Sequence, residues 1–386
     1  MIANMAAALA LAASAPPPTA AGTPDFPTCG PIVDQPCRIP DAISAADARR
    51  LLGDRTSAWR FDGDTLKVVA AGAQPPQLCC TFQGALDPVA GASGLWELSI
   101  RAPRLSEAVV DIALLSPTGA GKLDVWRGPA APPPAPQQAP PAEWVHSVTL
   151  DSKALGEQRR LEIYAPPADG APRPVIYMAD GGNVSHLAAI AHGLALAGLI
   201  REPILVGFDV GPTGPEPGQP GFDPQRHDLL RHREYLIGFQ GGEARFAGHE
   251  RFLLDEVLPY AEKTWGAKAD PALSAVMGES DGAAWALAMA ARHPDAFQTA
   301  IALSFTYGPP VLAVLKDHPI RNVYLGAGLY EDNPLRRTRD ASAELSGKAE
   351  RLRLEIRAAG HSPAAWDDQF AQALLWAFPA TGARRT

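Results

Sequence analysis

The sequence lacks the motifs that mark several large functional classes. No phosphate-binding glycine loop, dinucleotide fingerprint or HExxH pair occurs in its 386 residues. Asp and Glu (42 residues) outnumber Lys and Arg (34 residues), and the resulting net charge of −8 gives no basic surface for nucleic acid. These absences argue against hydride transfer, zinc proteolysis and nucleic-acid binding.

Only four cysteines occur, all within the first 80 residues. Cys29 and Cys37 bracket a short Pro-containing loop, and Cys79 and Cys80 are adjacent. No His stands near either pair at zinc-finger spacing, so no metal site is expected and structural disulfides in an oxidising compartment are favoured. We expect Cys29 and Cys37 each to pair with one of the adjacent cysteines, or else with each other.

Charged side chains are absent from residues 1–22, where Ala6 to Ala13 form a short apolar run. This run is far shorter than the roughly 20 residues that cross a bilayer, so membrane insertion is not expected. Its length fits the apolar region of a secretory signal, and small residues follow it at possible cleavage sites. We therefore predict a signal peptide at residues 1–22 and a periplasmic or secreted protein. A disordered Ala/Pro tail is the alternative.

Proline is abundant: its 39 residues are about twice the usual share of roughly 5%. Residues 129–143 consist mostly of Pro, Ala and Gln, which is typical of a semi-rigid linker. Residues 23–128 contain short β-like runs separated by Gly and Pro, which predicts a small all-β sandwich domain. Residues 144–380 alternate β-like runs with helical patterns, which predicts an α/β domain with a mostly parallel sheet covered on both faces.

Individual runs support this division. Strands of the sandwich are expected at residues 66–69, 95–100 and 108–115. Strands of the α/β domain are expected at residues 161–164, 175–178, 204–207, 273–277, 299–303, 322–325 and 352–356. Helices between them are expected at residues 187–197, 249–265, 282–292 and 363–377.

The segment Gly278-Glu279-Ser280-Asp281-Gly282 matches the pattern G-x-S-x-G. A predicted strand enters it and a predicted helix leaves it, as in the nucleophile turn of the α/β-hydrolase fold. Small residues beside the serine avoid steric clashes in that turn, and the helix N-terminus favours a developing oxyanion. Ser280 is therefore the candidate nucleophile, although an ordinary glycine-rich turn with a surface serine is the structural alternative.

A serine nucleophile of this fold takes its acid and its base from later loops, in the order Ser, acid, His. His361 follows the strand expected at residues 352–356, and an acidic loop follows the strand expected at residues 322–325. We predict His361 as the general base. For the acid, Asp332 is the first choice, Glu331 the second and Asp340 the third.

Main-chain N–H groups are expected to stabilise the oxyanion. Tyr177 to Ala179 form an apolar strand end that is followed by Asp180-Gly181-Gly182. In this fold the loop after an early central strand supplies one donor, and the residue after the nucleophile supplies the other. The N–H groups of Gly182 and Asp281 are the predicted donors.

Residues 207–248 are rich in Pro and Gly and are expected to form a long loop. We predict that Arg226, Arg231 and Arg233 in this loop bind an anionic or catechol-type group of the substrate. The alternative is a solvated loop that the Arg233–Glu234 pair braces. Trp366 is expected near His361 and is a further candidate for substrate binding.

These motifs together resemble the esterase D and enterochelin-esterase-like branch of the α/β-hydrolases. The stretches that carry the resemblance are residues 175–181 (VIYMADG), 233–236 (REYL), Phe252 with 256–259 (EVLP), the Ser280 turn, and Gly360-His361 with Trp366. The first domain resembles the early-set, immunoglobulin-like module that precedes the catalytic domain of enterochelin esterases. The resemblance implies cleavage of siderophore, feruloyl or S-formylglutathione esters, or acyl transfer.

We therefore predict a serine carboxylic-ester hydrolase that works through an acyl-enzyme without a metal or organic cofactor. Its substrate is expected to be a small-molecule or polysaccharide-linked ester, such as a siderophore or feruloyl ester. Two alternatives remain: an acyltransferase of the same fold, and an inactive ligand-binding protein.

Overall fold

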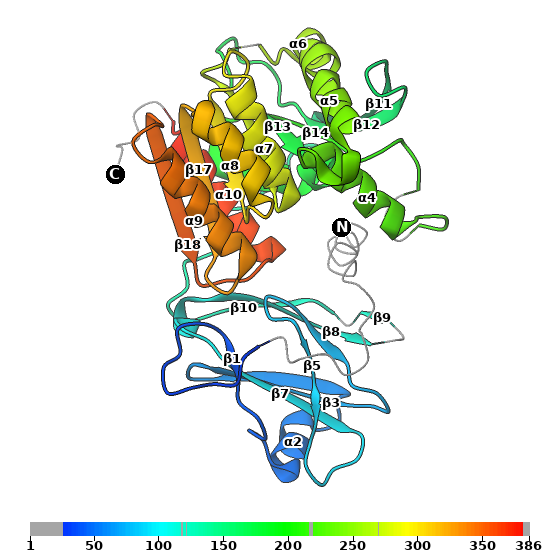
Figure 1. Ribbon diagram of the computed structural model, residues 1–386, viewed down its shortest axis with the longest axis vertical. Coiled ribbons are helices and arrows are strands. Elements are labelled where there is room, and N and C mark those ends of the chain that lie inside the picture. The colour runs from blue at the N-terminus through cyan, green and yellow to red at the C-terminus, as the bar shows by residue number, and fades with distance from the viewer. Residues whose placement is uncertain (1–25, 117–118, 121, 216–218, 269, 381–386) are drawn as a thin grey trace.

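The computed structural model describes residues 26–380 apart from 117–118, 121, 216–218 and 269 (Figure 1). The expected signal peptide lies outside the described residues. The chain forms a β-sandwich and a larger α/β part, which Figure 1 shows one below the other. No helix in the described part of the chain is long and apolar enough to cross a membrane.

The β-sandwich consists of two antiparallel sheets. The first has the strand order β1-β7-β3-β2 with β6 beside β7: Cys37–Arg38, Leu95–Arg101, Thr65–Ala71, Ser57–Asp62 and Asp87–Pro88. The second has the order β10-β8-β4-β5 with β9 beside β8: Asp124–Arg127, Val109–Ser116, Gln77–Cys80, Gly84–Ala85 and Gly119–Ala120. Alternate residues such as Val68 and Leu98 of the first sheet and Leu78 and Val110 of the second form the shared core.

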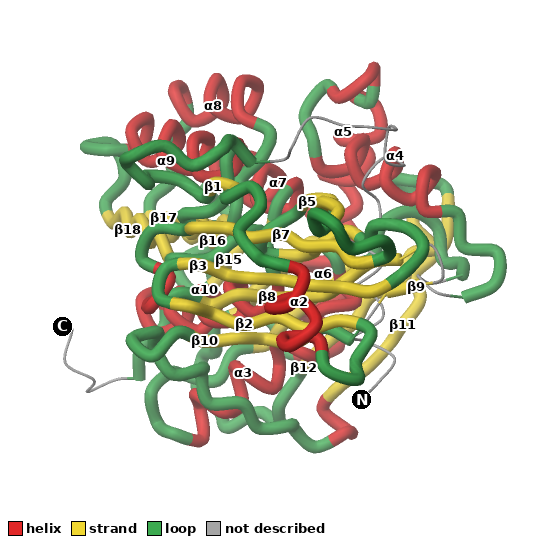
Figure 2. Tube along the Cα trace, turned by 90° about the horizontal axis from the view of Figure 1, so that it is seen from below, coloured by secondary structure: helices red, strands yellow, loops and turns green. Residues whose placement is uncertain are grey.

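The sandwich is oriented with the second sheet, which contains β8 and β10, next to the α/β part (Figure 1). Helix α2 (Ala45–Leu52), which the sequence did not predict, lies at the opposite end and is nearest the viewer in Figure 2. The second sheet therefore faces the α/β part.

The two cysteine pairs close within themselves. Cys29 is bonded to Cys37, and Cys79 is bonded to Cys80. The first expected pairing, in which Cys29 and Cys37 each bond one of the adjacent cysteines, is therefore wrong, and the second is present. The physical reason is that Cys37 lies on β1 of the first sheet, whereas Cys79 and Cys80 lie on β4 of the second sheet.

The α/β part is built on an eight-stranded sheet of order β11-β12-β14-β13-β15-β16-β17-β18. Strand β12 runs antiparallel to both of its neighbours, β11 and β14, whereas the strands from β14 to β18 along this order run parallel to one another. The strand bounds are Val145–Ser152, Glu157–Tyr164, Ile204–Phe208, Val175–Ala179, Ser274–Glu279, Thr299–Leu303, Asn322–Gly328 and Arg351–Arg357. All seven strands expected in this region are confirmed, and β11 is additional.

Both faces of this sheet are covered because its central strands are apolar on both sides. On β13, Ile176 and Met178 pack against one helical layer, whereas Val175, Tyr177 and Ala179 pack against the other. The first layer contains α3 (Val184–Leu196) and α10 (Pro363–Ala377). The second contains α4 (Pro224–Tyr235), α5 (Glu243–Arg251), η5 (Phe252–Val257), α6 (Leu258–Trp265), α7 (Asp281–Arg292), α8 (Gly308–Asp317) and α9 (Asn333–Leu345).

The segment expected as a long loop, residues 207–248, differs from that expectation. It contains α4 and most of α5, and α4 begins with Asp223 as its N-cap and Pro224 in its first turn. The residues of α4 are mostly polar, so the helical pattern of apolar residues is too weak to reveal it. This helix lies beside the candidate nucleophile and contributes to the site described below.

The Pro-rich segment between the two parts lies against α3. The N–H of Gln138 donates to the carbonyl of Ala189, 2.9 Å away. A side chain at Gly193 would approach the carbonyl oxygen of Pro136 to 2.5 Å, so a glycine is needed at this contact. The segment is therefore packed on the α/β part rather than extended away from it.

Candidate active site

Ser280 occupies a sharp turn between β15 and α7. Its φ of 57° lies in the left-handed region that a non-glycine residue rarely adopts. A Cβ at Gly278 would overlap the backbone of Gly282, and a Cβ at Gly282 would approach the Cβ of Ala179 to 2.9 Å. The two glycines of the motif are thus required by close packing of strand, turn and helix, which leaves the serine at the carboxyl end of the sheet.

His361 and Glu331 lie together at the carboxyl end of the sheet, as Ser280 does. Glu331 follows β17, His361 follows β18, and His361 Nδ1 is 2.7 Å from Glu331 Oε1. The other oxygen, Glu331 Oε2, accepts a hydrogen bond from the N–H of Gly328 at 2.6 Å. The carboxylate is buried, while about a third of the imidazole is exposed. A carboxylate at Nδ1 favours the proton on that nitrogen and leaves Nε2 free to accept one.

The other two candidate acids lie elsewhere. Asp332 is exposed at the N-cap position of α9, and Asp340 pairs with Arg337 at 3.4 Å. Of the three acids left open by the sequence, Glu331 is the one in contact with His361. The chain turns into α9 directly after Glu331, which directs the carboxylate of Asp332 toward solvent.

Trp366 of α10 connects the His361 loop with the strand next to Ser280. Its indole ring meets the imidazole edge-on, with centroids 4.8 Å apart, and its Nε1 donates to Ser304 Oγ at 2.8 Å. Ser304 directly follows Leu303, whose carbonyl accepts the N–H of Ser280 at 2.8 Å. A continuous series of contacts therefore links His361 to the Ser280 turn across β16.

The two predicted oxyanion donors lie at the starts of helices that follow adjacent strands. Gly182 is in η3 (Gly181–Asn183) after β13, and Asp281 is the first residue of α7 after β15. The N–H groups in the first turn of a helix have no intrahelical partner, so both are available to an oxygen of a substrate.

Arg231 of α4 joins these two loops. Its Nε and Nη2 donate to the two carboxylate oxygens of Asp180 at 2.9 and 2.7 Å, and its Nη1 donates to Asp281 Oδ2 at 3.1 Å. Asp180 directly precedes the Gly181-Gly182 turn, and Asp281 directly follows Ser280. Arg231 is buried beneath the turns. The sequence predicted Arg231 as a substrate-binding residue, whereas the structure places it under the two turns, paired with these carboxylates.

Asp281 is held by a set of donors that the sequence did not reveal. Thr306 Oγ1 lies 2.7 Å from Asp281 Oδ1, and His232 Nε2 lies 3.1 Å from Oδ2. Burial alone would raise the pKa of Asp281, but the hydrogen bond from His232 and the charge of Arg231 outweigh it and lower the pKa to about 2. Thr306, like Ser304, comes just after the strand β16, and this strand-end position is the signal that could have identified both.

The other two arginines are placed differently. Arg226 is exposed in the first turn of α4, where its own N–H donates to Asp223 Oδ1 at 3.1 Å. Arg233 packs its side chain against Gly242. Glu234 is buried between Arg159, 2.9 Å away, and Arg245. The alternative interpretation, a loop braced by an Arg233–Glu234 pair, therefore differs from the structure, in which Glu234 pairs with Arg159 and Arg245.

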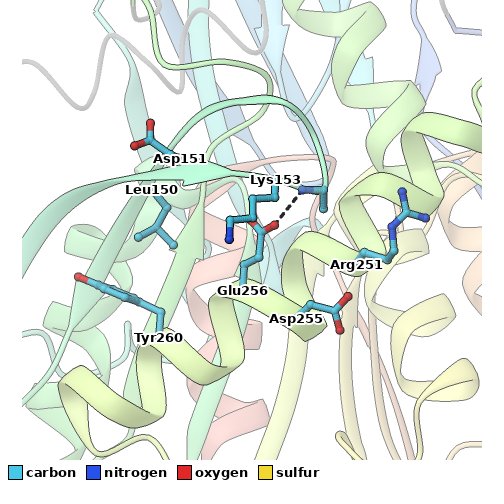
Figure 3. A pocket seen from close by; sticks show the side chains of 8 residues that line it. Leu150, Asp151, Lys153, Arg251, Asp255, Glu256 and Tyr260 are labelled. Atoms are coloured by element: carbon cyan, nitrogen blue, oxygen red, sulfur yellow. Dashed lines mark hydrogen bonds between the residues drawn. The ribbon is translucent and has the colours of Figure 1, made fainter.

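A cavity of about 560 Å³ lies beside β11, the outer strand of the sheet that is farthest from β18 (Figure 3). Its lining residues are Leu150, Asp151, Lys153, Ala154, Arg251, Asp255, Glu256 and Tyr260. Glu256 accepts a hydrogen bond from the N–H of Ala154 at 2.8 Å, and no Ser, Cys or His lines the cavity. The cavity therefore offers no serine or cysteine nucleophile with a histidine base of the kind expected at the Ser280 site.

Known proteins resemble the chain in sequence and in fold. A family model described as "Putative esterase" matches residues 152–377. The enterobactin esterase FES from Shigella flexneri, in the presence of enterobactin, is similar with a TM-score of 0.63 at 15% identity, covering 83% of this chain and 95% of that one. The ferric enterobactin esterase from Salmonella typhimurium is similar with a TM-score of 0.62 at 14% identity, covering 83% and 96%. Among curated proteins nothing matches.

The structural likeness extends over more of the chain than the family model and therefore includes part of the β-sandwich. At this level of identity it shows a shared fold, an α/β-hydrolase domain preceded by a β-sandwich. The family match itself spans more than half of the 386 residues. The chain therefore belongs to this esterase family, and the protein is a carboxylic ester hydrolase.

Proposed function

We propose that the protein cleaves esters through a covalent acyl-enzyme, with Ser280 as nucleophile, His361 as general base and Glu331 as the acid that orients it. The observation that carries the proposal is the contact between His361 Nδ1 and Glu331 Oε1, at the sheet edge that also bears the Ser280 turn. This order of nucleophile, orienting carboxylate and histidine is the one that α/β-hydrolases use.

In the first half of the reaction, Ser280 Oγ attacks the ester carbonyl carbon while its proton passes to His361 Nε2. The carbonyl oxygen becomes an oxyanion that accepts hydrogen bonds from the N–H groups of Gly182 and Asp281. The C–O bond to the alcohol then breaks, and the proton on His361 leaves with the alcohol. Ser280 is left as an acyl ester.

In the second half, water replaces the alcohol. His361 Nε2 takes a proton from the water as its oxygen attacks the acyl carbon, and the same oxyanion site is used again. Breaking the bond to Ser280 Oγ returns the proton to the serine and releases a carboxylic acid. Each step uses groups of this chain alone, so the proposal calls for no metal or organic cofactor.

We propose an aryl-bearing ester, of the siderophore or feruloyl type, as the substrate class. Trp366 beside His361 supplies an aromatic edge at the catalytic base, where a planar acyl or alcohol group can pack. The enterobactin esterases share the two-part fold. We further propose a periplasmic or secreted location, which the two disulfides favour.

Turnover of p-nitrophenyl acetate and butyrate tests the reaction class. We expect the wild-type protein to release p-nitrophenol and Ser280→Ala to lose nearly all of this activity. The matched control is Ser274→Ala, because Ser274 is buried at the opposite end of the same strand, bonded to the carbonyl of Asp270.

Product analysis separates the alternatives. An acyltransferase would give an acylated acceptor in place of the free acid, and a ligand-binding protein would give saturable binding without turnover. A folded wild-type protein without turnover on these esters, siderophore esters or feruloyl esters would rule the proposal out.

A further inference from the structure

The β-sandwich packs directly against the loop that carries the proposed acid. Tyr330 immediately precedes Glu331, and its hydroxyl donates to the carbonyl of Pro103 at 2.9 Å. Its ring lies 5.1 Å from that of Phe82, which follows β4. Tyr330 is buried as part of the sandwich core together with residues such as Leu78 and Val110. The residue next to the acid is thus embedded in the other domain.

The loop that carries His361 is held in the same way. The N–H of Val109 on β8 donates to the carbonyl of Ala358 at 3.0 Å, and Val109 also forms a β-bridge with Ala359. A Cβ at Gly360 would overlap the backbone of Thr81, so the glycine before His361 lets the sandwich pack against the loop backbone. This loop therefore contacts both the sandwich and the acid loop, and it is joined to the latter by the hydrogen bond from the N–H of Tyr330 to the carbonyl of Ala359 at 2.9 Å.

Asp111 of β8 anchors the chain on the far side of His361. Its carboxylate is buried, and Oδ2 accepts the N–H of Ala364, at the start of α10, at 3.2 Å. The N–H of Asp111 donates to Thr81 Oγ1 at 2.9 Å, which ties the anchor to the residue that packs on Gly360. Farther along α10, Arg127 of β10 binds both oxygens of Asp368 at 2.8 and 3.0 Å.

The His361 loop is thus fixed at both ends by the β-sandwich, before the histidine through Val109 and Thr81 and after it through Asp111 and Arg127. The position of the imidazole depends on the backbone between these anchors. Reacting groups displaced by about 1 Å lose on the order of 100-fold in rate, so these contacts bear directly on proton transfer.

We infer that the β-sandwich is a working part of the active site, and that Asp111 is a positioning residue that holds His361 in place for catalysis. The inference rests on the proposed function, because it assigns to the sandwich the placement of the proposed general base. It makes the first domain more than an appended module: the active site is complete only when the sandwich is docked against the loops of Glu331 and His361.

The test compares Asp111→Ala, Asp111→Asn and Arg127→Gln in the full chain, with Ser44→Ala as the control. Ser44 caps α2 at the far end of the sandwich by accepting the N–H of Asp47 at 3.1 Å, a contact of the same kind as that of Asp111 (Figure 1). Asparagine keeps an oxygen acceptor for the Ala364 N–H, whereas alanine does not. Arg127→Gln provides a second disruption, at a partly exposed side chain.

Kinetics with p-nitrophenyl acetate and hydrogen exchange of the peptide covering residues 358–366 are the two measurements. We expect Asp111→Ala to lower kcat at least tenfold with KM changed less than about twofold, and to speed exchange in this peptide. We expect Arg127→Gln to act in the same direction, and Asp111→Asn and Ser44→Ala to keep most of the wild-type kcat.

Wild-type kcat in folded Asp111→Ala and Arg127→Gln would overturn the inference, whether or not exchange changes. An equal loss of kcat in Ser44→Ala would also overturn it, because the effect would then be one of general stability. An inactive wild-type protein would refute the proposed function instead. The two failures can be distinguished, because in that case activity is missing before any substitution is made.

Discussion

The Ser280 turn and the His361 loop lie at the same edge of one sheet but are held by different neighbours. The Ser280 turn is held within the α/β part, by Leu303, by Arg231 and by Thr306 through Asp281. The His361 loop is held by Val109, Thr81 and Asp111 of the β-sandwich. The half of the proposed site around Ser280, here called the nucleophile half, is thus held by one domain, whereas the half around His361, here called the base half, contacts both domains.

The pKa values of the buried carboxylates also differ between the two halves. Asp281 in the nucleophile half is surrounded by donors and cations, which lower its pKa to about 2 despite burial. Asp111 in the base half is buried with fewer compensating partners, and burial raises its pKa to about 6 against the hydrogen bond from the N–H of Ala364. Ion pairs at Asp180 and Asp281 therefore hold most of the first half. The His361 loop is held by packing, by main-chain contacts and by the Asp111 carboxylate, and one ion pair, Arg127–Asp368, lies farther along α10.

The largest effect is expected from Glu331, the proposed acid of the base half. Glu331→Gln would place an amide N–H opposite His361 Nδ1 and favour the wrong tautomer, so we expect kcat to fall by roughly 10³- to 10⁴-fold. Asp332→Asn is the matched control and should keep wild-type kcat, because Asp332 is exposed beside α9. Esterase kinetics on both variants decide the matter, and the reverse pattern would assign the acid to Asp332.

The next effect tests the dependence of the base half on the sandwich. Gly360→Ala introduces a Cβ that overlaps the backbone of Thr81, so the loop must shift, and we expect kcat to fall by roughly 100-fold. Gly30→Ala serves as the control, since nothing lies within 4 Å of its Cβ position. Equal kcat for the two folded variants would show that the His361 loop tolerates displacement and that the contact is unimportant.

A smaller effect is expected from the clamp of the nucleophile half. Arg231→Lys keeps the charge but loses the bidentate contact with Asp180, which loosens the two loops that bear the proposed oxyanion donors. We expect kcat to fall by roughly tenfold to 100-fold, less than the cost of removing an oxyanion donor outright. The exposed Arg226 provides the comparison: Arg226→Ala should keep kcat, and a raised KM in that variant would support the substrate-binding role predicted from the sequence.

The smallest effect on activity is expected from Asp111→Asn, which should instead change how the unfolding free energy depends on pH. The pKa of Asp111 is raised from 3.8 in the unfolded chain to about 6, so its ionised form destabilises the folded protein above pH 6 and this cost disappears as the pH falls below about 4. We expect the gain in unfolding free energy of Asp111→Asn over wild type to be about 2 kcal/mol larger at pH 8 than at pH 4. Urea unfolding at the two pH values measures it, and a difference that does not change with pH would contradict the raised pKa.

The same comparison explains what the sequence could and could not predict. The Ser280 turn is local: five residues, a strand before and a helix after suffice to identify it. His361 could be placed because it also follows a predicted strand. The choice between Glu331 and Asp332 could not be made, because it depends on the direction in which the chain turns into α9.

Features that depend on tertiary contacts escaped prediction. Helix α4 has few apolar residues, and its buried Arg231 and Glu234 are satisfied by ion pairs that no periodicity reveals. The anchor between Asp111 and Ala364 joins residues 253 positions apart in the sequence. The role that we infer for the sandwich could therefore emerge only once the two domains were seen in contact.

Peptide mapping of a fluorophosphonate adduct on the full chain is the most direct test of the proposed nucleophile, because the probe reacts with a serine that is activated by its base. We expect one adduct, on the peptide that contains Ser280, which is absent from Ser280→Ala and forms much more slowly in Gly360→Ala than in Gly30→Ala. A folded wild-type protein without an adduct, or with its adduct on another residue, would refute Ser280 as the nucleophile.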